Sequence, residues 1–254
     1  MTAGWDQGAA EFARWARQLW QPLAVPLIEA ARLSPGDRVF DACCGTGASA
    51  LLAAQAVGAD GQVDAVDASA GMIDQAKSAA VPEQLDFRVA DALTWPGSGY
   101  HAVLCGFGIF FLGDQSAALA SLADRLAPGG RIALSVWQGR PFDALTRLVL
   151  AACAAEGAGV GGPSAEAKNI GELNSPSKLT DFLRGAGLRE VAVAAVRHRV
   201  PLTPDSAWSF VHSSLLRSAL PADPAALARV KARLAGSLGG VELQADALIG
   251  SARR

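Results

Sequence analysis

The stretch Val39-Phe40-Asp41-Ala42-Cys43-Cys44-Gly45-Thr46-Gly47 decides how the rest of the chain is interpreted. Consecutive apolar residues that lead into an Asp predict a strand covered on both faces and ending in a carboxylate. The glycines behind it allow positive φ angles and a close approach of the backbone to a ligand. A helix is predicted directly afterwards, over Ala48 to Val57. Strand, glycine turn and helix in this order are typical of an α/β fold that binds a nucleotide-like ligand.

The same alternation of strand and helix continues along the chain. Strands are predicted over Arg38–Cys43, Gln62–Asp67, Leu85–Ala90, Ala102–Cys105 and Arg131–Trp137. Helices are predicted over Ala48–Val57, Gly71–Ala80, Gln115–Leu126 and Phe142–Ala155. Alternating strands and helices with short connections predict a doubly wound, Rossmann-like α/β fold with a mostly parallel sheet.

The segments on either side of this core are predicted to complete the sheet and to cover it. Apolar residues from Trp5 to Leu23 recur at helical spacing and predict one amphipathic helix. The Gly-, Ser- and Pro-rich stretch 157–174 predicts a mobile loop. Ser175-Pro176 and Thr203-Pro204 are typical of helix starts. Sixth and last strands are predicted over 191–200 and 241–252, which brings the sheet to seven strands.

Four segments follow from this pattern. Residues 1–30 are predicted to be an N-terminal helical cap and 31–140 the ligand-binding core. Residues 141–240 supply helices, the sixth strand and the rest of a substrate cap, and 241–254 the last strand of the sheet.

Composition excludes several classes of protein. The chain has 254 residues, 51% of them hydrophobic, and 22 Lys and Arg against 24 Asp and Glu give a net charge of -2. A chain without excess positive charge is not expected to bind nucleic acid. No apolar run is long enough to span a bilayer, so a cytoplasmic location is predicted. The four Cys and three His do not have metal-ligand spacing, and no metal site is predicted.

The glycine loop alone leaves two ligands open. Gly45 to Ala50 also fits G-x-G-x-x-A, and Asp67 follows at the distance expected for a dinucleotide fold. Asp41, however, is badly placed for a pyrophosphate and well placed for a ligand that carries positive charge. Asp91, after the third strand, offers an acceptor for an exocyclic amine such as that of adenine. Tyr100 is followed four residues later by Leu104 and not Lys, so the Tyr-x-x-x-Lys pair of short-chain reductases is missing.

The chain resembles the class I S-adenosylmethionine-dependent methyltransferases, in particular the ubiquinone/menaquinone methyltransferase-like group. Matching motifs occur along the sheet, and jointly they are specific: Val39–Gly47, Val66–Met72, Val89–Ala92, Cys105–Gly108 and Leu126–Arg131. Cys43 departs from the pattern, because the family's first motif usually has Gly there.

The resemblance implies a site for S-adenosylmethionine, with S-adenosylhomocysteine as product. Asp41 and Cys43 are expected at the methionine end, Asp67 at the ribose and Asp91 at the adenine amine. The residues expected to bind the cofactor are Asp41, Ala42, Cys43, Gly45, Gly47, Asp67, Ala68, Met72, Ala90, Asp91, Ala92, Gly106 and Phe107.

The acceptor is expected to be a small apolar or aromatic specialised metabolite. Aromatic residues after the fourth strand, at the carboxyl edge of the sheet, suit a pocket wall, and the resemblance implies that the first helix closes over the cofactor. The substrate-binding candidates are Trp5, Phe12, Phe110, Phe111, Trp208 and His212. His212 shares a helix side with apolar neighbours, so a packed His is the default expectation, and a general base that removes a substrate hydroxyl proton is the alternative. Arg140 is expected to be solvated. Phe110-Phe111 favours another apolar metabolite over a quinone precursor.

The predicted reaction is an in-line displacement at the sulfonium methyl, with O-methylation the first expectation and C- or N-methylation open. A protein that binds the cofactor without transferring methyl, or a cyclase on the same fold, is the main alternative. An NAD(P)-dependent reductase and a nucleic-acid methyltransferase are weaker ones. Both a monomer and a homodimer stay open.

Overall fold

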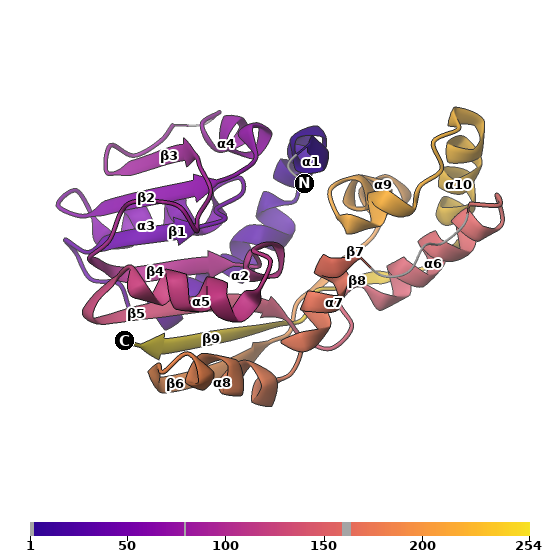
Figure 1. Ribbon diagram of the computed structural model, residues 1–254. Helices are drawn as coiled ribbons and strands as arrows, with labels where there is room; N and C mark the ends of the chain where they lie inside the picture. The colour runs from indigo at the N-terminus through magenta and orange to yellow at the C-terminus, as the bar shows by residue number, and fades with distance from the viewer. Residues whose placement is uncertain (1–2, 79, 159–163) are drawn as a thin grey trace.

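The computed structural model describes residues 3–78, 80–158 and 164–254 and has a seven-stranded sheet at its centre (Figure 1). Its strands are β1 Arg38–Ala42, β2 Gln62–Asp67, β3 Leu85–Val89, β4 Tyr100–Gly106, β5 Leu126–Trp137, β6 Arg189–Val196 and β9 Ala247–Arg253. They lie in the order β3-β2-β1-β4-β5-β9-β6. The first five are parallel, whereas β9 pairs antiparallel with both β5 and β6. The predicted mostly parallel, seven-stranded sheet is confirmed.

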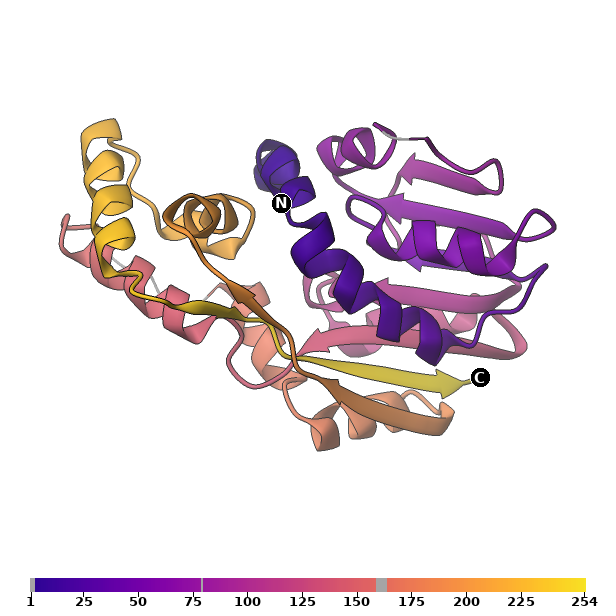
Figure 2. The same ribbon diagram turned by 180° about the vertical axis from the view of Figure 1, so that it is seen from behind.

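Helices cover both faces of this sheet. On the face seen in Figure 2 lie α2 (Gln21–Ala31) and α3 (Ala48–Val57), and on the face seen in Figure 1 lie α5 (Gln115–Asp124) and α8 (Pro176–Gly185). A short helix, α4 (Ala70–Ala76), follows β2. Ser175 caps α8 by accepting a hydrogen bond from the Lys178 N–H, as its sequence predicted. Residues 21–30, which the sequence pattern groups with the cap, belong to α2 and pack on the sheet.

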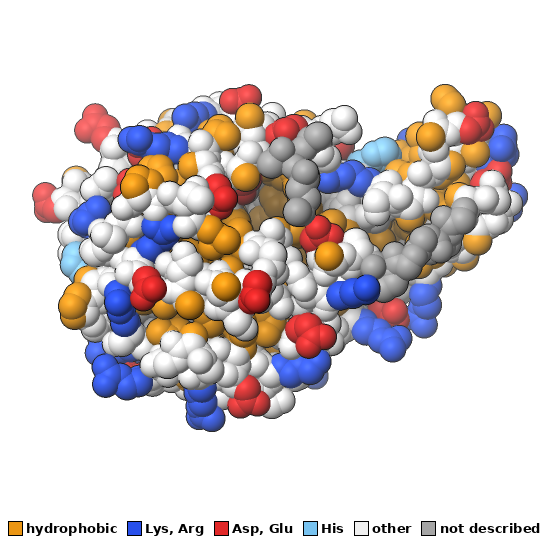
Figure 3. All heavy atoms as spheres, viewed as in Figure 1, with side chains coloured by type: hydrophobic (Ala, Val, Ile, Leu, Met, Phe, Trp, Pro, Cys, Tyr) orange, Lys and Arg blue, Asp and Glu red, His pale blue; other side chains and the backbone are white. Residues whose placement is uncertain are grey.

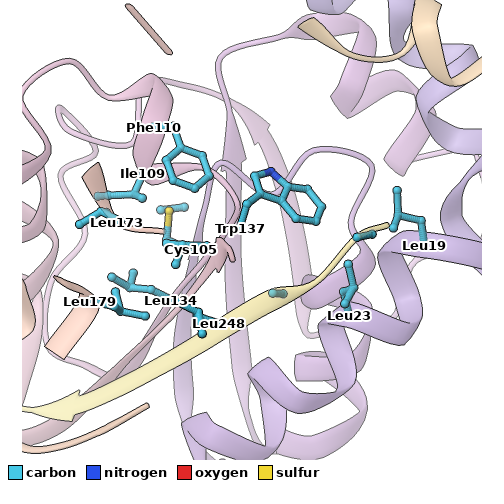
Figure 4. Close-up of a cluster of buried hydrophobic side chains, with 14 of the residues drawn as sticks. Leu19, Leu23, Cys105, Ile109, Phe110, Leu134, Trp137, Leu173, Leu179 and Leu248 are labelled. Atoms are coloured by element: carbon cyan, nitrogen blue, oxygen red, sulfur yellow. The ribbon is translucent and has the colours of Figure 1, made fainter. Parts of the chain in front are cut away.

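The sheet is apolar on both faces because each face is buried. Leu134 of β5 and Leu248 of β9 pack with Leu179 of α8 in one cluster (Figure 4). On the opposite face Leu27 of α2 packs with Leu104 and Ala133. Burying these side chains is the main force that holds the layers together, at about 25 cal/mol per Å² of apolar surface.

The N-terminal helix is not continuous, contrary to the prediction. It consists of α1 (Ala3–Arg14), a π-helical turn η1 (Ala16–Trp20) and α2. Pro22 accounts for the interruption, because a helical proline donates no hydrogen bond and its ring crowds the carbonyl four residues earlier. That carbonyl belongs to Gln18, and it lies 2.6 Å from Nε2 of His198 instead. The chain therefore changes direction between α1 and α2.

The cap is built from helices inserted between two short strands. β7 (Arg199–Pro201) and β8 (Glu242–Gln244) form a separate two-stranded sheet, and α9 (Pro204–His212), η3 (Leu215–Ala219) and α10 (Pro224–Ser237) lie between them in the chain. The predicted strands 191–200 and 241–252 are thus each divided in two. Asp246 causes the break, because its carboxylate accepts the His198 N–H and pairs with Arg199. The cap also contains α6 (Asp143–Ala154), which packs against α10.

The predicted loop 157–174 is wrong over part of its length. Residues 165–172 form a helix, α7 (Ala165–Glu172), that begins at Ser164, whose hydroxyl accepts the Ala167 N–H. Asn169 of α7 donates its side-chain amide to the Phe110 carbonyl at 3.0 Å. Residues 159–163 of the predicted loop lie outside the described residues.

Two smaller points complete the fold. The predicted helix 71–80 is shorter than expected and ends at Ala76. A short 3-10 turn, η2 (Ile109–Phe111), follows β4.

Over residues 3–78, 80–158 and 164–254, no helix combines the length and the apolar character needed to cross a membrane. The division into four segments stays a prediction.

Candidate functional site

A cavity of about 920 Å³ lies at the carboxyl edge of the parallel strands, where ligands bind in open α/β sheets. Its wall comes from the sheet edge, from α1, η1 and α2, and from the cap. The space-filling view shows hydrophobic side chains within a recess between the sheet and the cap (Figure 3). The cavity has two parts: the loops after β1, β2 and β3 form a polar half, and aromatic side chains form the other.

The loop after β1 is fixed by backbone hydrogen bonds. The Cys44 N–H donates to the Val66 carbonyl at 2.9 Å, and the Gly45 N–H donates to Oδ2 of Asp67 at 2.9 Å. Gly47 has φ +88°, and a Cβ there would lie 2.6 Å from Cζ of Phe87. Only glycine meets both conditions, so the loop passes tightly into α3.

Asp41 is buried at the end of β1 beneath this loop. Its Oδ2 accepts a hydrogen bond of 2.6 Å from the Ser49 hydroxyl, and Oδ1 has no partner among the described residues. Burial raises the pKa of Asp41 to about 7, because the charged form is poorly solvated there. Ser49 lines the cavity, whereas Asp41 does not. The predicted contact of Asp41 with a positively charged ligand is therefore indirect.

Asp67 lines the polar half from the end of β2. Its Oδ1 accepts the Ser69 N–H at 2.9 Å, while Oδ2 holds the Gly45 N–H. Burial is the main cause that raises the pKa of Asp67. Each carboxylate oxygen of Asp67 keeps a second lone pair, so the two oxygens can together accept hydrogen bonds from a vicinal diol. Asp91 also lines the cavity, and its Oδ1 accepts the Leu93 N–H at 2.8 Å.

Helix α1 covers the polar half of the cavity, next to the loop that follows β2. Oδ1 of Asp6 accepts hydrogen bonds from the Ser69 hydroxyl at 2.6 Å and the Gly71 N–H at 3.0 Å. Five residues further along α1, Glu11 accepts a hydrogen bond of 2.5 Å from the Ser209 hydroxyl of α9. Helix α1 thus connects the polar half with the cap.

Cys43 lies in the left-handed backbone region, with φ +58°. This explains why a glycine suits the position, since a side chain there costs about 1–2 kcal/mol. Its Cβ packs against Gly108, and its thiol makes a hydrogen bond with Cys105 that, together with burial, raises the pKa of Cys43. A thiol with a raised pKa is a poor nucleophile at neutral pH.

We expect Cys43→Gly to fold and to change the free energy of unfolding by less than about 1 kcal/mol, because relief of strain offsets the greater freedom of the unfolded chain. Cys43→Val is the matched control. A β-branched residue at this φ should lower the free energy of unfolding by at least about 2 kcal/mol. Urea denaturation of the two variants checks this, and equal stability would refute the assignment of strain.

Stacked aromatic rings line the other half of the cavity. Phe12 and Trp20 stack with ring centroids 4.3 Å apart, and Phe107 and Trp137 stack at 4.0 Å. Trp5 meets Phe111 edge-on at 5.3 Å. These rings come from α1, η1, the ends of β4 and β5, and η2, which are remote in sequence. The fold therefore gathers them into one apolar chamber beside Asp67 and Cys43.

The structure brings many of the predicted site residues together and separates others. The lining includes the predicted residues Cys43, Gly45, Asp67, Ala68, Met72, Asp91, Gly106, Phe107, Trp5, Phe12 and Phe111. The predicted residues outside the lining are Asp41, Ala42, Gly47, Ala90, Ala92, Phe110, Trp208 and His212. Of these, Gly47 acts through the shape of the loop, as described above. Phe110 is 1% exposed and belongs to the core under η2, so its expected place in the substrate wall is wrong.

His212 is not in the cavity wall. Its ring packs edge-on against Trp208 at 4.9 Å, and burial is the main cause that lowers its pKa. The neighbouring residues Ser213 to Leu216 line the cavity instead, because α9 ends at His212 and the chain turns there. This geometry fits a His212 that packs inside the cap and does not fit a general base in the cavity.

Several lining residues were not predicted. Trp20, Leu23, Ser135, Trp137, Arg140 and Phe142 line the cavity. Trp137 ends β5 at the ligand-binding edge of the sheet, a sequence signal that was available. Trp20 lies four residues after Ala16 and three before Leu23, so helical spacing already places it at the edge of the Trp5 to Leu23 stripe. Arg140 was expected to be solvated; it is exposed and also lines the cavity.

Comparison with known proteins agrees with this geometry. Residues 39–130 match the family model of a methyltransferase domain. Aklanonic acid methyltransferase DauC of Streptomyces sp. (strain C5) is 34% identical over 140 residues, which cover 53% of this chain and 64% of that relative. A 2-phytyl-1,4-naphtoquinone methyltransferase of Synechococcus elongatus is 35% identical over 136 residues, covering 51% of this chain and 57% of that relative.

The similarity extends further in structure than in sequence. The crystal structure of YcgJ from Bacillus subtilis has a TM-score of 0.59 at 17% identity and covers 92% of this chain and 98% of that one, which shows a shared fold. The chain spans less than two thirds of the two curated relatives described above. Residues 39–130 nonetheless match a methyltransferase domain, and the motifs that resemble those of the class I S-adenosylmethionine-dependent methyltransferases lie in and around that match.

Proposed function

We propose that the chain transfers a methyl group from S-adenosylmethionine to a planar aromatic, quinone-like metabolite. The observation that carries this proposal is the single cavity, in which the polar edge formed by Asp67 and Asp91 is continuous with the aromatic chamber. The printed names of the relatives, aklanonic acid and phytyl-naphthoquinone methyltransferases, support an aromatic acceptor. Phe110 is buried in the core and does not oppose a quinone acceptor.

The residues present fit the cofactor. When bound, S-adenosylmethionine supplies an electrophilic methyl group on a positively charged sulfur. Asp67 has free lone pairs for the ribose hydroxyls, and Asp91 offers its carboxylate to the adenine amine. The buried carboxyl of Asp41 lies behind Ser49 and has a pKa of about 7, and a cationic ligand in the polar half favours its charged form. Cys43, Gly45 and Met72 supply the surrounding wall.

The chain contributes alignment and exclusion of water at the reacting atoms. Holding two reactants in line and close to contact contributes about 7–11 kcal/mol in favourable cases. Helix α1 is suited to this because Asp6 ties it to the loop after β2 and Glu11 ties it to α9. The described part of the cavity wall contains no histidine. An acceptor oxygen that is already ionised at neutral pH needs no protein base, so O-methylation remains our first assignment.

Calorimetric titration tests the first half of the proposal. We expect S-adenosylmethionine and S-adenosylhomocysteine to bind and NADH not to bind. Transfer of tritiated methyl from the labelled cofactor to a panel of hydroxylated anthraquinones and naphthoquinones tests the second half. Failure of both adenosyl ligands to bind would disprove the proposal, and binding without transfer to any aromatic acceptor would favour a non-transferring protein.

A further inference from the structure

The segment that follows β5 forms one side of the cavity from its inner end to its mouth. Ser135, Trp137, Arg140 and Phe142 all line the cavity. Because Arg140 is the fifth residue after Ser135, the Cα atoms of the two lie at most about 18 Å apart. This one segment therefore presents polar side chains at both ends of an aromatic wall.

The backbone that holds Arg140 is fixed on both sides. The Gly139 N–H donates to the Asn174 carbonyl at 2.8 Å, and the Asn174 side chain returns a hydrogen bond of 3.1 Å to the Gly139 carbonyl. The Gln138 N–H donates to Asp246, and the Phe142 N–H donates to Gln244, each at 2.9 Å. The start of the Arg140 side chain is thus held in place, while its guanidinium reaches the exposed mouth.

Arg140 carries a positive charge that the protein leaves available. Among the described residues that line the cavity, it is the only Arg, Lys or His. In the parts of the chain that the structure describes, its guanidinium makes no hydrogen bond or ion pair. The nearby carboxylate of Asp143 is already paired with Arg147 at 3.2 Å. The other lining carboxylates, Asp67 and Asp91, belong to the cofactor half.

The inner end of the same wall has the opposite character. The Ser135 side chain is 0% exposed, and its hydroxyl has no hydrogen-bond partner in the described residues. It lies beside Gly106 in the sheet, and its carbonyl accepts the Phe107 N–H at 3.0 Å. A buried hydroxyl without a partner is costly unless a ligand or water completes it. We therefore expect a polar atom of a ligand to bind the Ser135 hydroxyl, at the border between the polar and the aromatic halves of the cavity.

Building on the proposed function, we propose that the acceptor is an elongated aromatic acid recognised by Arg140. Its ionised carboxylate or phenolate pairs with the guanidinium at the mouth, its rings lie along Trp137 and Phe142, and its reacting end points toward Ser135. Planar guanidinium groups bind carboxylates through two parallel hydrogen bonds. Arg140 thus selects the acceptor by a charge that is remote from the methylated atom.

Two probes that differ in charge but not in ring system test this. Anthraquinone-2-carboxylate and anthraquinone-2-carboxamide are titrated into the protein saturated with S-adenosylhomocysteine, and quenching of tryptophan fluorescence reports binding, since Trp5, Trp20 and Trp137 line the cavity. We expect the carboxylate to bind the wild type at least threefold more tightly than the amide. Arg140→Gln should abolish this preference, and Arg140→Lys should retain part of it.

Arg184→Gln is the matched control, because it removes the same charge from an exposed position on α8 outside the cavity wall. It should keep the full preference for the carboxylate. Equal binding of the two probes to the wild type, no binding of either, or a preference that survives in Arg140→Gln would each overturn the inference. Calorimetry with S-adenosylhomocysteine alone tests the proposed function separately. If that function is right, Arg140→Gln, Arg140→Lys and Arg184→Gln all bind S-adenosylhomocysteine as tightly as the wild type, whatever the two probes show.

Discussion

Asp67→Ala is expected to lower the affinity for S-adenosylhomocysteine by at least tenfold, or about 1.4 kcal/mol. The reason is twofold. The variant loses the acceptors proposed for the ribose, and it also releases the Gly45 and Ser69 N–H groups that the carboxylate holds at 2.9 Å. Removing the partner of buried donors costs about 1–3 kcal/mol each. Isothermal titration calorimetry measures the loss directly.

Asp74→Ala provides the control for this experiment. Asp74 is exposed on α4, seven residues further along the chain, and lies outside the cavity wall. Its removal changes the net charge by the same amount and should leave the affinity unchanged. If Asp67→Ala and Asp74→Ala bind S-adenosylhomocysteine equally well, then Asp67 does not hold the cofactor, and the position of the ribose has to be sought elsewhere in the cavity.

The ligand-free protein is expected to lose stability as the pH rises from 4 to 7, because of Asp41. Burial raises its pKa from 3.8 to about 7, so in this interval the folded protein keeps a proton that the unfolded chain has released. The free energy of unfolding falls wherever the folded state binds more protons. At 1.36 kcal/mol per pKa unit, the loss amounts to roughly 4 kcal/mol. Asp67, whose pKa is also raised, adds a loss of the same sign.

Asp41→Asn should remove most of this dependence. An Asn side chain keeps an oxygen that accepts the Ser49 hydroxyl, and it carries no charge to desolvate. Urea denaturation at pH 5, 6, 7 and 8 measures the slope in both proteins, with Asp60→Asn, an exposed residue in the turn before β2, as control. A slope in Asp41→Asn as steep as that of the wild type would show that Asp41 ionises freely in the fold.

Local sequence determined the core of this protein because each signal there is short in range. The pattern from Val39 to Gly47 predicted β1, the glycine turn and the start of α3, and all three are where the pattern placed them. Asp67 was predicted because the family spacing and the strand end coincide at one residue, and it lines the polar half of the cavity. Helix starts at Ser175 and Thr203 were also predicted, since capping depends on neighbouring residues alone.

Tertiary structure decided which residues line the aromatic half of the cavity. Phe110 and Phe111 are adjacent and chemically alike, yet one is core and the other lines the cavity, because η2 turns them in different directions. Helical spacing placed His212 with the cap, but only the end of α9 determines that Ser213 and the residues after it face the cavity.

The same distinction holds for the two residues at either end of the acceptor wall. Arg140 becomes part of the site through hydrogen bonds of its loop to Asn174, Gln244 and Asp246, which are remote in sequence. Ser135 was hidden inside an apolar strand, and only the buried state of its hydroxyl marks it. The sequence by itself determined the core of the fold and the polar half of the cavity, because they depend on local backbone geometry. Packing between distant segments determined the aromatic half, because side-chain direction there depends on contacts that no local pattern encodes.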